Sequence, residues 1–398
     1  MLRSLYSGIS GLRAHQTMLD VTGNNIANVN TQGFKASSVE FQDTLSQMTK
    51  GASAPTAASG GTNPAQVGLG VQVAGISTNF TQGSSEATGK ATDMMISGDG
   101  FFVVQQGGET LYTRAGSLGQ DAQGRLVTPD GALVQGWPAT NGVVATGGPV
   151  GDITLSTQNL AGATRTTKAT VSGNLPADGT GSPLTRDIQV YDASGKASSV
   201  SLTLTYSNPA GTPTWAVSTD GGTTTDATLT FGADGKPTAT SSTSLTYGTA
   251  PSAVTVGLST VTGFSGLSTT TAKADDGGPA GTLESFTLSK DGTIVGSFSN
   301  GTKQAVGQIA LASFANPGGL EKAGSSSYRA SANSGAATLG VAGSAGLGTL
   351  VAGSLEMSNV DLSQEFTNLI VAQRGFQANA RVITTSDTVL QELIDLKR

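Results

Sequence analysis

Apolar residues recur every three or four positions at both ends of this chain. Gln16 and Gly23 interrupt the pattern at the N-terminal end, and Gln373 and Asp387 interrupt it at the C-terminal end. A narrow stripe of this period predicts a helix that packs against a second helix, as in a coiled coil. The stripes consist of Leu2, Leu5, Ile9, Leu12, Leu19 and Ile26, and of Phe366, Leu369, Phe376, Ala380, Ile383, Leu390 and Ile394.

Two terminal helices of this kind favour pairing with each other and with further copies of the chain. An isolated helix of this length is marginal in water, so we expect the ends to be loosely ordered in the monomer and to order on assembly. The alternative is that both helices dock on the core of one globular domain. No wide apolar face accompanies either stripe, and this favours assembly.

Between the ends the apolar period changes from about 3.5 to two, which predicts β-strands. Expected strands include residues 101–104, 133–137 and 199–206, separated by turns rich in Gly, Asp and Asn. Residues 146–283 are richer in Thr, Ser and Gly than the β-patterned segments on either side. We therefore expect one β-domain with a second inserted into it, each a meander or a small barrel or sandwich.

The predicted fold is mainly β and multidomain, with terminal helices forming a coiled-coil assembly domain. Residues 39–48 are expected to form a short helical turn, and the Ala-, Ser-, Gly- and Pro-rich segment after them a linker. The predicted parts are the helical domain (1–35 and 359–398), the linker region (36–70), the inner β-domain (71–146 and 283–358) and the inserted outer β-domain (147–282).

Composition excludes several classes of function. The net charge is −6, so there is no basic footprint for nucleic acid. No apolar run is long enough to span a membrane. The chain has no cysteine, which excludes disulfides and thiolate sites and suits a bacterial extracellular protein. The first residues open directly into the helical pattern without a secretory signal, so we expect an export route that leaves the N-terminus intact.

The residues for catalysis are missing as well. His15 is the only histidine, so neither a catalytic triad nor a multi-histidine metal site can be assembled. Neither a phosphate-binding glycine loop nor a nucleophile-elbow motif occurs. We therefore expect no enzymatic activity, no cofactor and no metal. A secreted β-rich adhesin or carbohydrate-binding protein would share the Thr/Gly composition but would have no use for matched stripes at both ends.

Five sequence blocks resemble the family of bacterial flagellar rod and hook proteins. They cover residues 24–35 (NNIANVNTQGFK), 97–102 (SGDGFF), 112–116 (YTRAG), 358–361 (SNVD) and 372–379 (AQRGFQAN). Residues 63–70 and 133–138 resemble hook proteins within this family, and the inserted segment is absent from the shorter rod proteins. Residues 146–283 carry no recognisable motif, so the outer domain is assigned by position alone.

This resemblance implies a structural subunit that is exported unfolded by the flagellar type III apparatus and polymerises into a curved tube outside the cell. The tube would join rod to filament as a universal joint. Implied partners are further copies of the chain, the rod and hook–filament junction proteins and the hook cap protein. A distal rod protein is the nearest alternative. Beside the two stripes, the resemblance adds these assembly residues: Asn24, Asn25, Asn28, Asn30, Gly33, Phe34 and Asn379.

Overall fold

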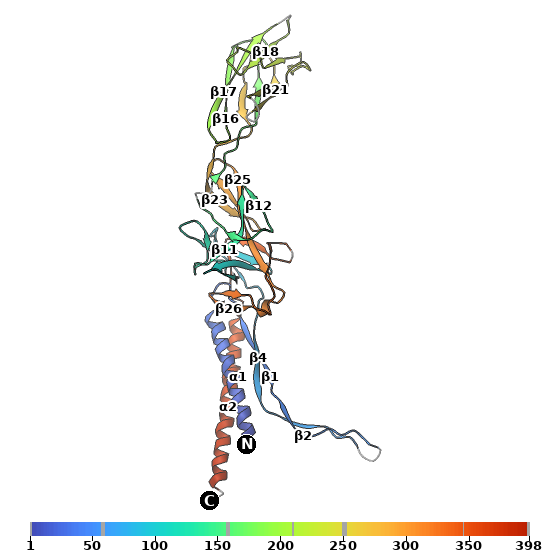
Figure 1. Ribbon diagram of the computed structural model, residues 1–398, viewed down its shortest axis with the longest axis vertical. Helices are drawn as coiled ribbons and strands as arrows, with labels where there is room; N and C mark the ends of the chain where they lie inside the picture. Colours follow the sequence, from blue (N-terminus) through green and yellow to red (C-terminus); the bar gives the residue numbers. More distant parts are fainter. Residues whose placement is uncertain are drawn as a thin grey trace.

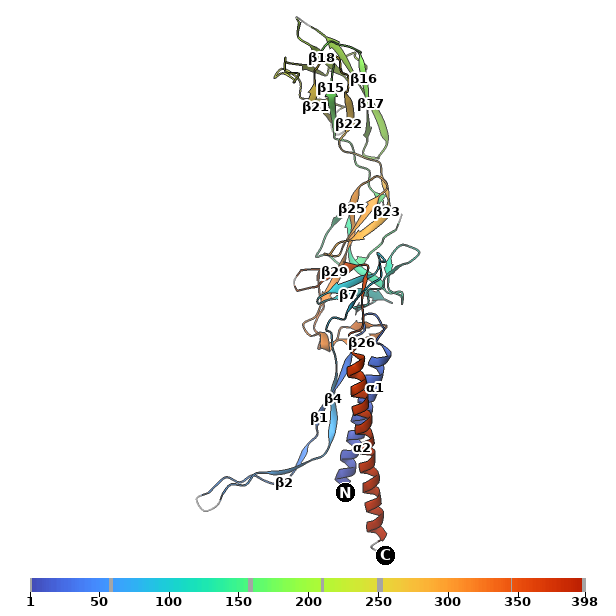
Figure 2. The same cartoon turned by 180° about the vertical axis from the view of Figure 1, so that it is seen from behind.

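The protein is elongated, with a pair of helices at one end and β-domains at the other (Figures 1 and 2). The computed structural model describes residues 2–56, 60–156, 160–208, 211–248, 253–344 and 346–395. The mainly β fold with a helix at each end is confirmed, but none of the sheets formed by these residues closes into a barrel. A β-hairpin, here called the arm (residues 36–78), leaves the side of the helix pair.

The two helices, α1 (Leu2–Ala27) and α2 (Leu362–Asp395), run antiparallel beside each other (Figure 1). Asp361 caps the start of α2, because its carboxylate accepts the backbone N–H groups of Ser363 at 2.8 Å and Gln364 at 3.2 Å. At the end of α1 the Asn28 side chain donates to the carbonyl of Asn24 at 2.9 Å. The asparagines of the N-terminal block therefore satisfy carbonyl groups that the last helical turn leaves unpaired.

The arm replaces the helical turn and the linker that the sequence predicts for residues 36–70. Its proximal part pairs β1 (Ser37–Asp43) with β4 (Val71–Thr78), and its distal part pairs β2 (Ser46–Lys50) with β3 (Ala65–Gly68). Both predictions were wrong because the apolar residues alternate with polar ones, as Val39 and Phe41 do, over a stretch too short to separate from a helix by composition. Antiparallel pairing satisfies the backbone in spite of the Gly-rich tip.

The inner β-body lies between the helix pair and the outer domain and contains a 14-stranded sheet. Its strands are β7 (Phe101–Gln106), β8 (Glu109–Thr113), β9 (Gly119–Gln120), β10 (Leu126–Val127), β11 (Leu133–Thr140), β12 (Val143–Val144), β13 (Gly151–Asp152), β14 (Leu160–Ala161), β23 (Gly281–Leu288), β24 (Thr293–Phe298), β25 (Lys303–Ser313), β26 (Glu321–Gly324), β27 (Ser327–Arg329) and β28 (Thr338–Val341).

Strands β7 and β25 form the centre of the inner body and are buried on both faces. Phe102 and Leu311 lie in one apolar cluster, and Phe101 and Ala312 lie in another on the opposite face. Because side chains alternate between faces along a strand, a continuous apolar run such as residues 101–104 fills two cores at once. The expected strand at residues 101–104 is confirmed within β7, and the one at 133–137 within β11.

Two small sheets join the N-terminal and C-terminal parts of the inner body. One pairs β6 (Met94–Ser97) with β29 (Thr349–Ala352), and the other pairs β5 (Ser85–Ala87) with β30 (Ser354–Glu356). These pairings bring segments from opposite ends of the sequence together directly above the helix pair. The strand β30 leads through residues 357–361 into α2.

The outer domain packs two four-stranded sheets against each other, as a sandwich. One contains β15 (Lys168–Asn174), β20 (Ser244–Tyr247), β21 (Val254–Thr262) and β22 (Thr271–Ala274). The other contains β16 (Leu184–Tyr191), β17 (Ala197–Ser207), β18 (Thr214–Ser218) and β19 (Ala227–Thr230). Trp215 is fully buried between them and donates its indole N–H to the carbonyl of Pro176 at 3.1 Å. The sandwich core shares no residue with the clusters of the inner body.

The outer domain begins later in the chain than predicted. It was predicted to begin at residue 147, but β13 and β14 still belong to the inner sheet. The chain crosses at Thr164 and returns at Gly278, where the two residues form an isolated β-bridge. The Gly/Pro-rich segment was mistaken for a boundary because strands of two residues carry too little pattern to be detected from sequence.

The two chain segments that connect the domains lie side by side at Thr164 and Gly278, and the two domains have separate cores. The inner body should therefore fold without the outer domain. Replacing residues 165–277 by a short Gly/Ser linker leaves Trp137 as the only tryptophan. We expect its fluorescence to report an unfolding midpoint within a few degrees of that of the complete chain. A much lower midpoint would show that the inner body depends on the outer domain.

Candidate functional site

The contact between α1 and α2 is made by small residues on α1. A Cβ atom added at Gly8 would lie 3.2 Å from Ile383, and one added at Gly11 would lie 2.7 Å from the Asn379 amide. Ala14 and Thr22 are buried on α1, and Ala372 is buried on α2. Small side chains let the two helix axes approach closely, so larger side chains on one helix fit into notches on the other.

Polar residues close both ends of the helix pair. At the free end the hydroxyl groups of Ser4 and Ser386 lie 3.5 Å apart. At the other end the Asn25 amide donates to Glu365 at 3.0 Å and to the Ser37 carbonyl at 2.7 Å, and accepts the Ser37 N–H at 3.0 Å. Buried polar groups are costly when unpaired, so these contacts specify the register of α1, α2 and the arm.

The apolar stripe predicted on α1 lies beside the α2 contact and overlaps it in part. Each residue advances a helix by about 100°, so Ile26 lies on nearly the same face as Gly8, whereas Ile9 lies about 100° round from Gly8. Ile9 remains 40% exposed, and the side chain of Leu2 lies outside the part of the chain that the structure describes. The remaining members are only half-buried, namely Leu5, Leu12, Leu19 and Ile26. The α1 stripe therefore stays a prediction of an assembly contact, because its described members are only partly covered within the chain itself.

On α2 the predicted stripe is divided between the α1 contact and solvent. Leu369, Phe376, Asn379, Ile383 and Leu390 are half-buried, whereas Phe366 and Ile394 are 52% and 67% exposed. Further apolar side chains of α2 are exposed, namely Leu362, Ile370, Val371, Val389 and Leu393, and also Val382, which lies at the edge of the α1 contact beside Gly8. The helix pair therefore presents apolar surface that a single chain leaves uncovered.

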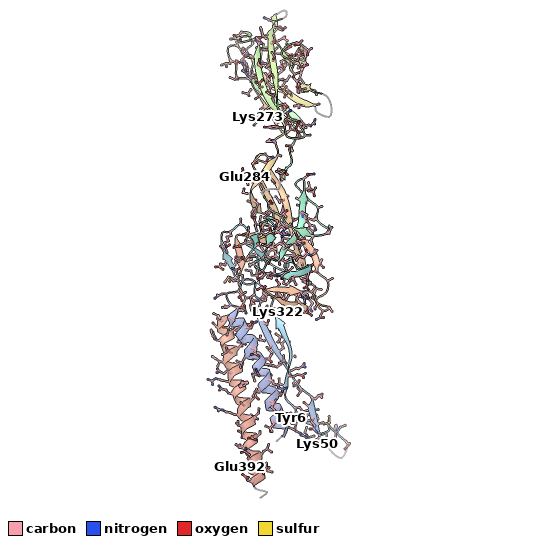
Figure 3. The ribbon with its side chains drawn as sticks, turned by 60° about the vertical axis from the view of Figure 1, so that its left-hand side comes forward. Tyr6, Lys50, Lys273, Glu284, Lys322 and Glu392 are labelled. Carbon is pink, nitrogen blue, oxygen red and sulfur yellow. The ribbon has the colours of Figure 1, made fainter. Side chains whose placement is uncertain are left out.

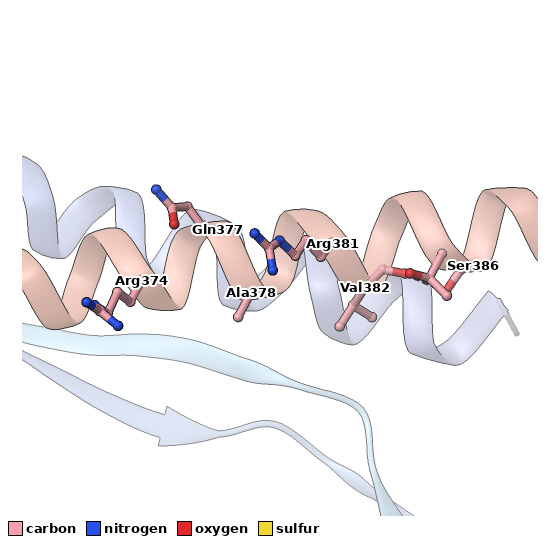
Figure 4. A pocket seen from close by; sticks show the side chains of 7 residues that line it. Arg374, Gln377, Ala378, Arg381, Val382 and Ser386 are labelled. Atoms are coloured by element: carbon pink, nitrogen blue, oxygen red, sulfur yellow. Dashed lines mark hydrogen bonds between the residues drawn. The ribbon is translucent and has the colours of Figure 1, made fainter.

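The face of α2 that points away from α1 is polar along its middle (Figure 4). Arg374, Gln377, Arg381 and Thr385 recur there at helical spacing and line a shallow groove with Ala378 and Val382. Neither arginine forms an ion pair with the residues that the structure describes. This band separates the apolar surface of α2 into two flanks.

A buried joint connects the helix pair, the arm and the inner body. The Lys35 ammonium donates to Glu356 at 2.6 Å and to the Thr81 carbonyl at 2.8 Å, and both charged side chains are completely buried. The same carboxylate oxygen accepts the backbone N–H of Gly83 at 2.9 Å. Burial lowers the pKa of Lys35, although the hydrogen bond and charge of Glu356 act in the opposite direction.

Arg114 brings a second cation to the joint. Its guanidinium lies 3.6 Å from the other Glu356 oxygen, donates to the Gly98 carbonyl at 2.8 Å and stacks 5.2 Å above the Phe101 ring. The nearby Tyr328 is buried, and desolvation raises its pKa to about 12, so its hydroxyl stays neutral. One carboxylate therefore serves two buried cations.

The sequence blocks from both ends of the chain converge on this joint. Gly33 takes a φ of +66°, donates its N–H to the Glu356 carbonyl at 2.8 Å and leaves no room for a Cβ beside Ala115. The Asn359 amide donates to the Asn79 carbonyl at 2.8 Å and accepts the Ala36 N–H at 2.8 Å. These blocks are far apart in the sequence but lie close together in space at the joint.

The other predicted asparagines lie at the edge of the joint. Asn24 and Asn30 are exposed, and Asn28 accepts the Thr31 hydroxyl at 3.0 Å. Phe34 lies beneath the ammonium of Lys322, which is 5.4 Å from the ring centre and sits where the helix pair meets the inner body (Figure 3). Sequence reasoning missed Glu356 and did not single out Lys35 or Arg114. The available signal was their charge in a chain with only 12% charged residues.

The proximal arm lies along α1, and the distal arm leaves it. The Ser10 hydroxyl accepts the Val71 N–H at 3.2 Å, and Gly70 is so close to Ser10 that no Cβ would fit. Beyond Thr44 nearly every described side chain of the arm is exposed, including Leu45 at 84%. A lone two-stranded hairpin with exposed apolar residues is marginal in water, so this part of the arm lacks a partner within the chain.

The described residues contain no cluster of three or more His, Asp or Glu side chains that is suited to a metal ion. Among the helices described, none is long and apolar enough to cross a membrane.

Three family models match this chain. They are described as flagella basal body rod protein (residues 5–35), flagellar hook protein FlgE/F/G D1 domain (95–203) and flagellar basal body rod FlgEFG protein C-terminal (351–396). The chain is 41% identical to the flagellar hook protein FlgE of Borreliella burgdorferi, over 100% of both chains. It belongs to the flagellar hook and rod protein family. Members of this family are structural proteins of the flagellum.

Two further relatives show the breadth of this family. The chain is 36% identical to the flagellar hook protein FlgE of Salmonella typhimurium, over 99% of this chain and 100% of that one. It is 34% identical to the flagellar basal-body rod protein FlgG of Bacillus subtilis, over 100% of both. A solved structure of a Helicobacter pylori flagellar hook protein aligns with a TM-score of 0.42 at 15% identity, covering 67% of this chain and 98% of that one.

The joint predicts a hierarchy of mutational effects. Glu356→Gln removes the carboxylate that faces both Lys35 and Arg114 and should destabilise the inner body by about 3–5 kcal/mol, whereas Lys35→Met should cost less because Arg114 still faces Glu356. Urea unfolding followed by Trp137 fluorescence in a Trp215→Phe background measures this. Glu109→Gln, at an exposed pair with Arg329, is the matched control and should change nothing measurable. Equal stability of Glu356→Gln and the parent would contradict the proposed energetics.

Proposed function

We propose that this chain is the structural subunit of a bacterial flagellar hook, which polymerises into a curved tube that transmits torque from rod to filament. The observation that carries this proposal is the uncovered apolar surface of the helix pair in a chain of this family. A single chain gains nothing from exposing these residues, whereas a polymer buries them at every repeated contact. Such head-to-tail contacts do not close on themselves and so generate a helical tube.

The α1 stripe is the proposed contact with a neighbouring copy. Leu5, Ile9, Leu12, Leu19 and Ile26 share one side of α1, next to the α2 contact. The exposed valines and leucines on α2 offer a complementary apolar face. Burying a half-exposed leucine or isoleucine contributes on the order of 1 kcal/mol, and the contribution is repeated in every copy.

The distal arm is a second proposed contact between copies. Leu45, Met48 and Val67 are exposed apolar residues on a hairpin that projects away from the body (Figures 1 and 2). Docking on a neighbour would bury them and would stabilise a hairpin that lacks support in its own chain. The arm would then link each copy to one that its helices do not touch.

The expected partners follow from this role. Beside further copies of the chain, they are the rod and hook–filament junction proteins at the two ends of the tube, the hook cap protein and the type III export apparatus. The proposed location is the flagellar hook, outside the cell, and the proposed activity is structural rather than enzymatic.

A distal rod protein is the second candidate, because a rod protein is 34% identical over the whole chain. The outer domain favours the hook. It is joined to the inner body through a single two-stranded crossing at Thr164 and Gly278, which suits subunit contacts that must shift as a tube bends. Electron microscopy of polymers grown from the purified protein distinguishes curved hook tubes from straight rods.

The first prediction places a charge in the α1 stripe. Leu12→Asp should abolish tube formation, because an unpaired carboxylate buried at each contact costs several kcal/mol. Leu12 is only half-buried in the chain itself, so the melting temperature of the soluble subunit should scarcely change. Sedimentation and electron microscopy measure assembly, and calorimetry measures stability.

The control at the same position is Leu12→Met, which conserves volume and should assemble normally. Ile383→Asp offers a contrast, because Ile383 packs over Gly8 and its charge should first separate α1 from α2. Normal tubes from Leu12→Asp would remove the α1 stripe from the interface.

A separate prediction concerns the distal arm. Replacing residues 45–69 by a two-residue turn between Thr44 and Gly70 should leave the unassembled subunit as stable as the parent, since none of the described residues among them belongs to an apolar core. Tubes should fail to form or should be too fragile to sediment. If the shortened chain instead makes tubes of normal length and yield, the arm is not an assembly contact.

A further inference from the structure

The only histidine of the chain lies where α1, α2 and the arm meet. The His15 ring packs edge-on against Phe41 of β1, with ring centres 6.0 Å apart and an interplanar angle of 62°. On its other side the ring faces α2 at Gly375. No other aromatic side chain of α1 or α2 makes a ring contact among the residues described.

Gly375 forms a notch that fits this ring. A Cβ atom added at position 375 would lie 2.5 Å from both Cε1 and Nε2 of His15, which is closer than real contacts allow. The Asn379 side chain donates to the Gly375 carbonyl at 2.8 Å and lies over Gly11, so the next turn of α2 encloses the notch. Nδ1 of His15 is buried and has no hydrogen-bond partner among the described residues. The contacts of this ring with Gly375 and Phe41 are therefore packing contacts.

Phe41 is the residue of the arm that contacts the His15 ring, as Gly375 does on α2. It lies at a β-bulge between Glu40 and Phe41, where the pairing of β1 with β4 passes over Ala74 of β4. A bulge re-aims a strand, and the arm leaves the helix pair just beyond this point, at Thr44. Hydrogen bonds of its backbone hold the proximal arm to α1 near its two ends, at Asn25 and Ser10. Between them, the ring of His15 contacts Phe41 at the point where the strand pairing shifts.

We propose that His15 is a positioning residue that sets the angle of the arm against the helix pair, and that Gly375 provides its seat on α2. A change in the spacing of the two helices would then also change the direction of the distal arm, because the His15 ring alone separates α2 from Phe41. This inference deepens the assembly function proposed above. It rests on that function only where tube formation is the property measured.

The first test is a double-mutant cycle. Gly375→Ala should lower tube yield at a fixed subunit concentration by about tenfold, since overpacking a filled site is destabilising. The double variant His15→Ala/Gly375→Ala should behave like His15→Ala alone, because the added methyl group then meets no ring. Gly23→Ala is the control and should assemble normally, because a Cβ added at this α1 glycine would have nothing within 4 Å.

The second test measures the arm directly. The chain has no cysteine, so Gln47→Cys on β2 and Gln377→Cys on α2 accept a unique pair of spin labels. We expect a narrow distance distribution in the parent, a broad or displaced one in His15→Ala, and recovery in His15→Phe, which keeps a ring. Measurements use the soluble chain and tubes diluted with unlabelled subunits.

Three results would overturn the proposal. They are an unchanged distribution in His15→Ala, a parent distribution that is broad in every sample, and a Gly375→Ala defect that persists without the ring. If the parent forms no tubes, the proposed polymer fails, and the distances in the soluble chain still decide whether His15 positions the arm.

Discussion

The structure depends on a single buried carboxylate that holds the two ends of the chain together. Glu356 arrives from the C-terminal part, Lys35 from the N-terminal part and Arg114 from the inner body. An unpaired charge at this depth is not tolerated, so the three segments must meet in one geometry or not at all. The helix pair and the arm inherit their positions from this point, since α1 ends a few residues before Lys35 and α2 begins a few residues after Glu356.

Small and large side chains have different places in the helix pair. Glycines and other small residues on α1 make room for side chains of α2 such as Ile383, whereas other leucines, valines and isoleucines of the two helices remain exposed. Close packing inside the pair needs small side chains, whereas a contact that must drive association needs apolar area. The subunit consequently keeps its larger apolar residues for the contact that we propose it makes with other copies.

Much of the fold was predictable from the sequence, and the errors have physical causes. The period of the two terminal helices and the two-residue period of the middle follow from side-chain geometry alone. The sequence could not show which face of α1 packs against α2, because a stripe of large apolar residues gives the same pattern whether it faces a partner helix or another copy of the chain. The arm was missed because its strands are short and its tip is rich in Gly, Ala and Pro. The joint at Glu356 was missed because pairing across the whole chain leaves no local pattern.

The nested order of the domains has a consequence for how the chain folds. Lys35 and Glu356 are 321 residues apart, and closing so long a loop in a disordered chain is slow and entropically costly. The sandwich of the outer domain is built from strands within residues 168–274 alone, and its completion brings Thr164 beside Gly278. The segments of the inner sheet are then separated by a much shorter disordered loop. Once that sheet has formed, the loop that the joint must close is shorter still. Folding would thus proceed from the middle of the sequence outward, and the helices that join one subunit to the next would be the last parts to become ordered.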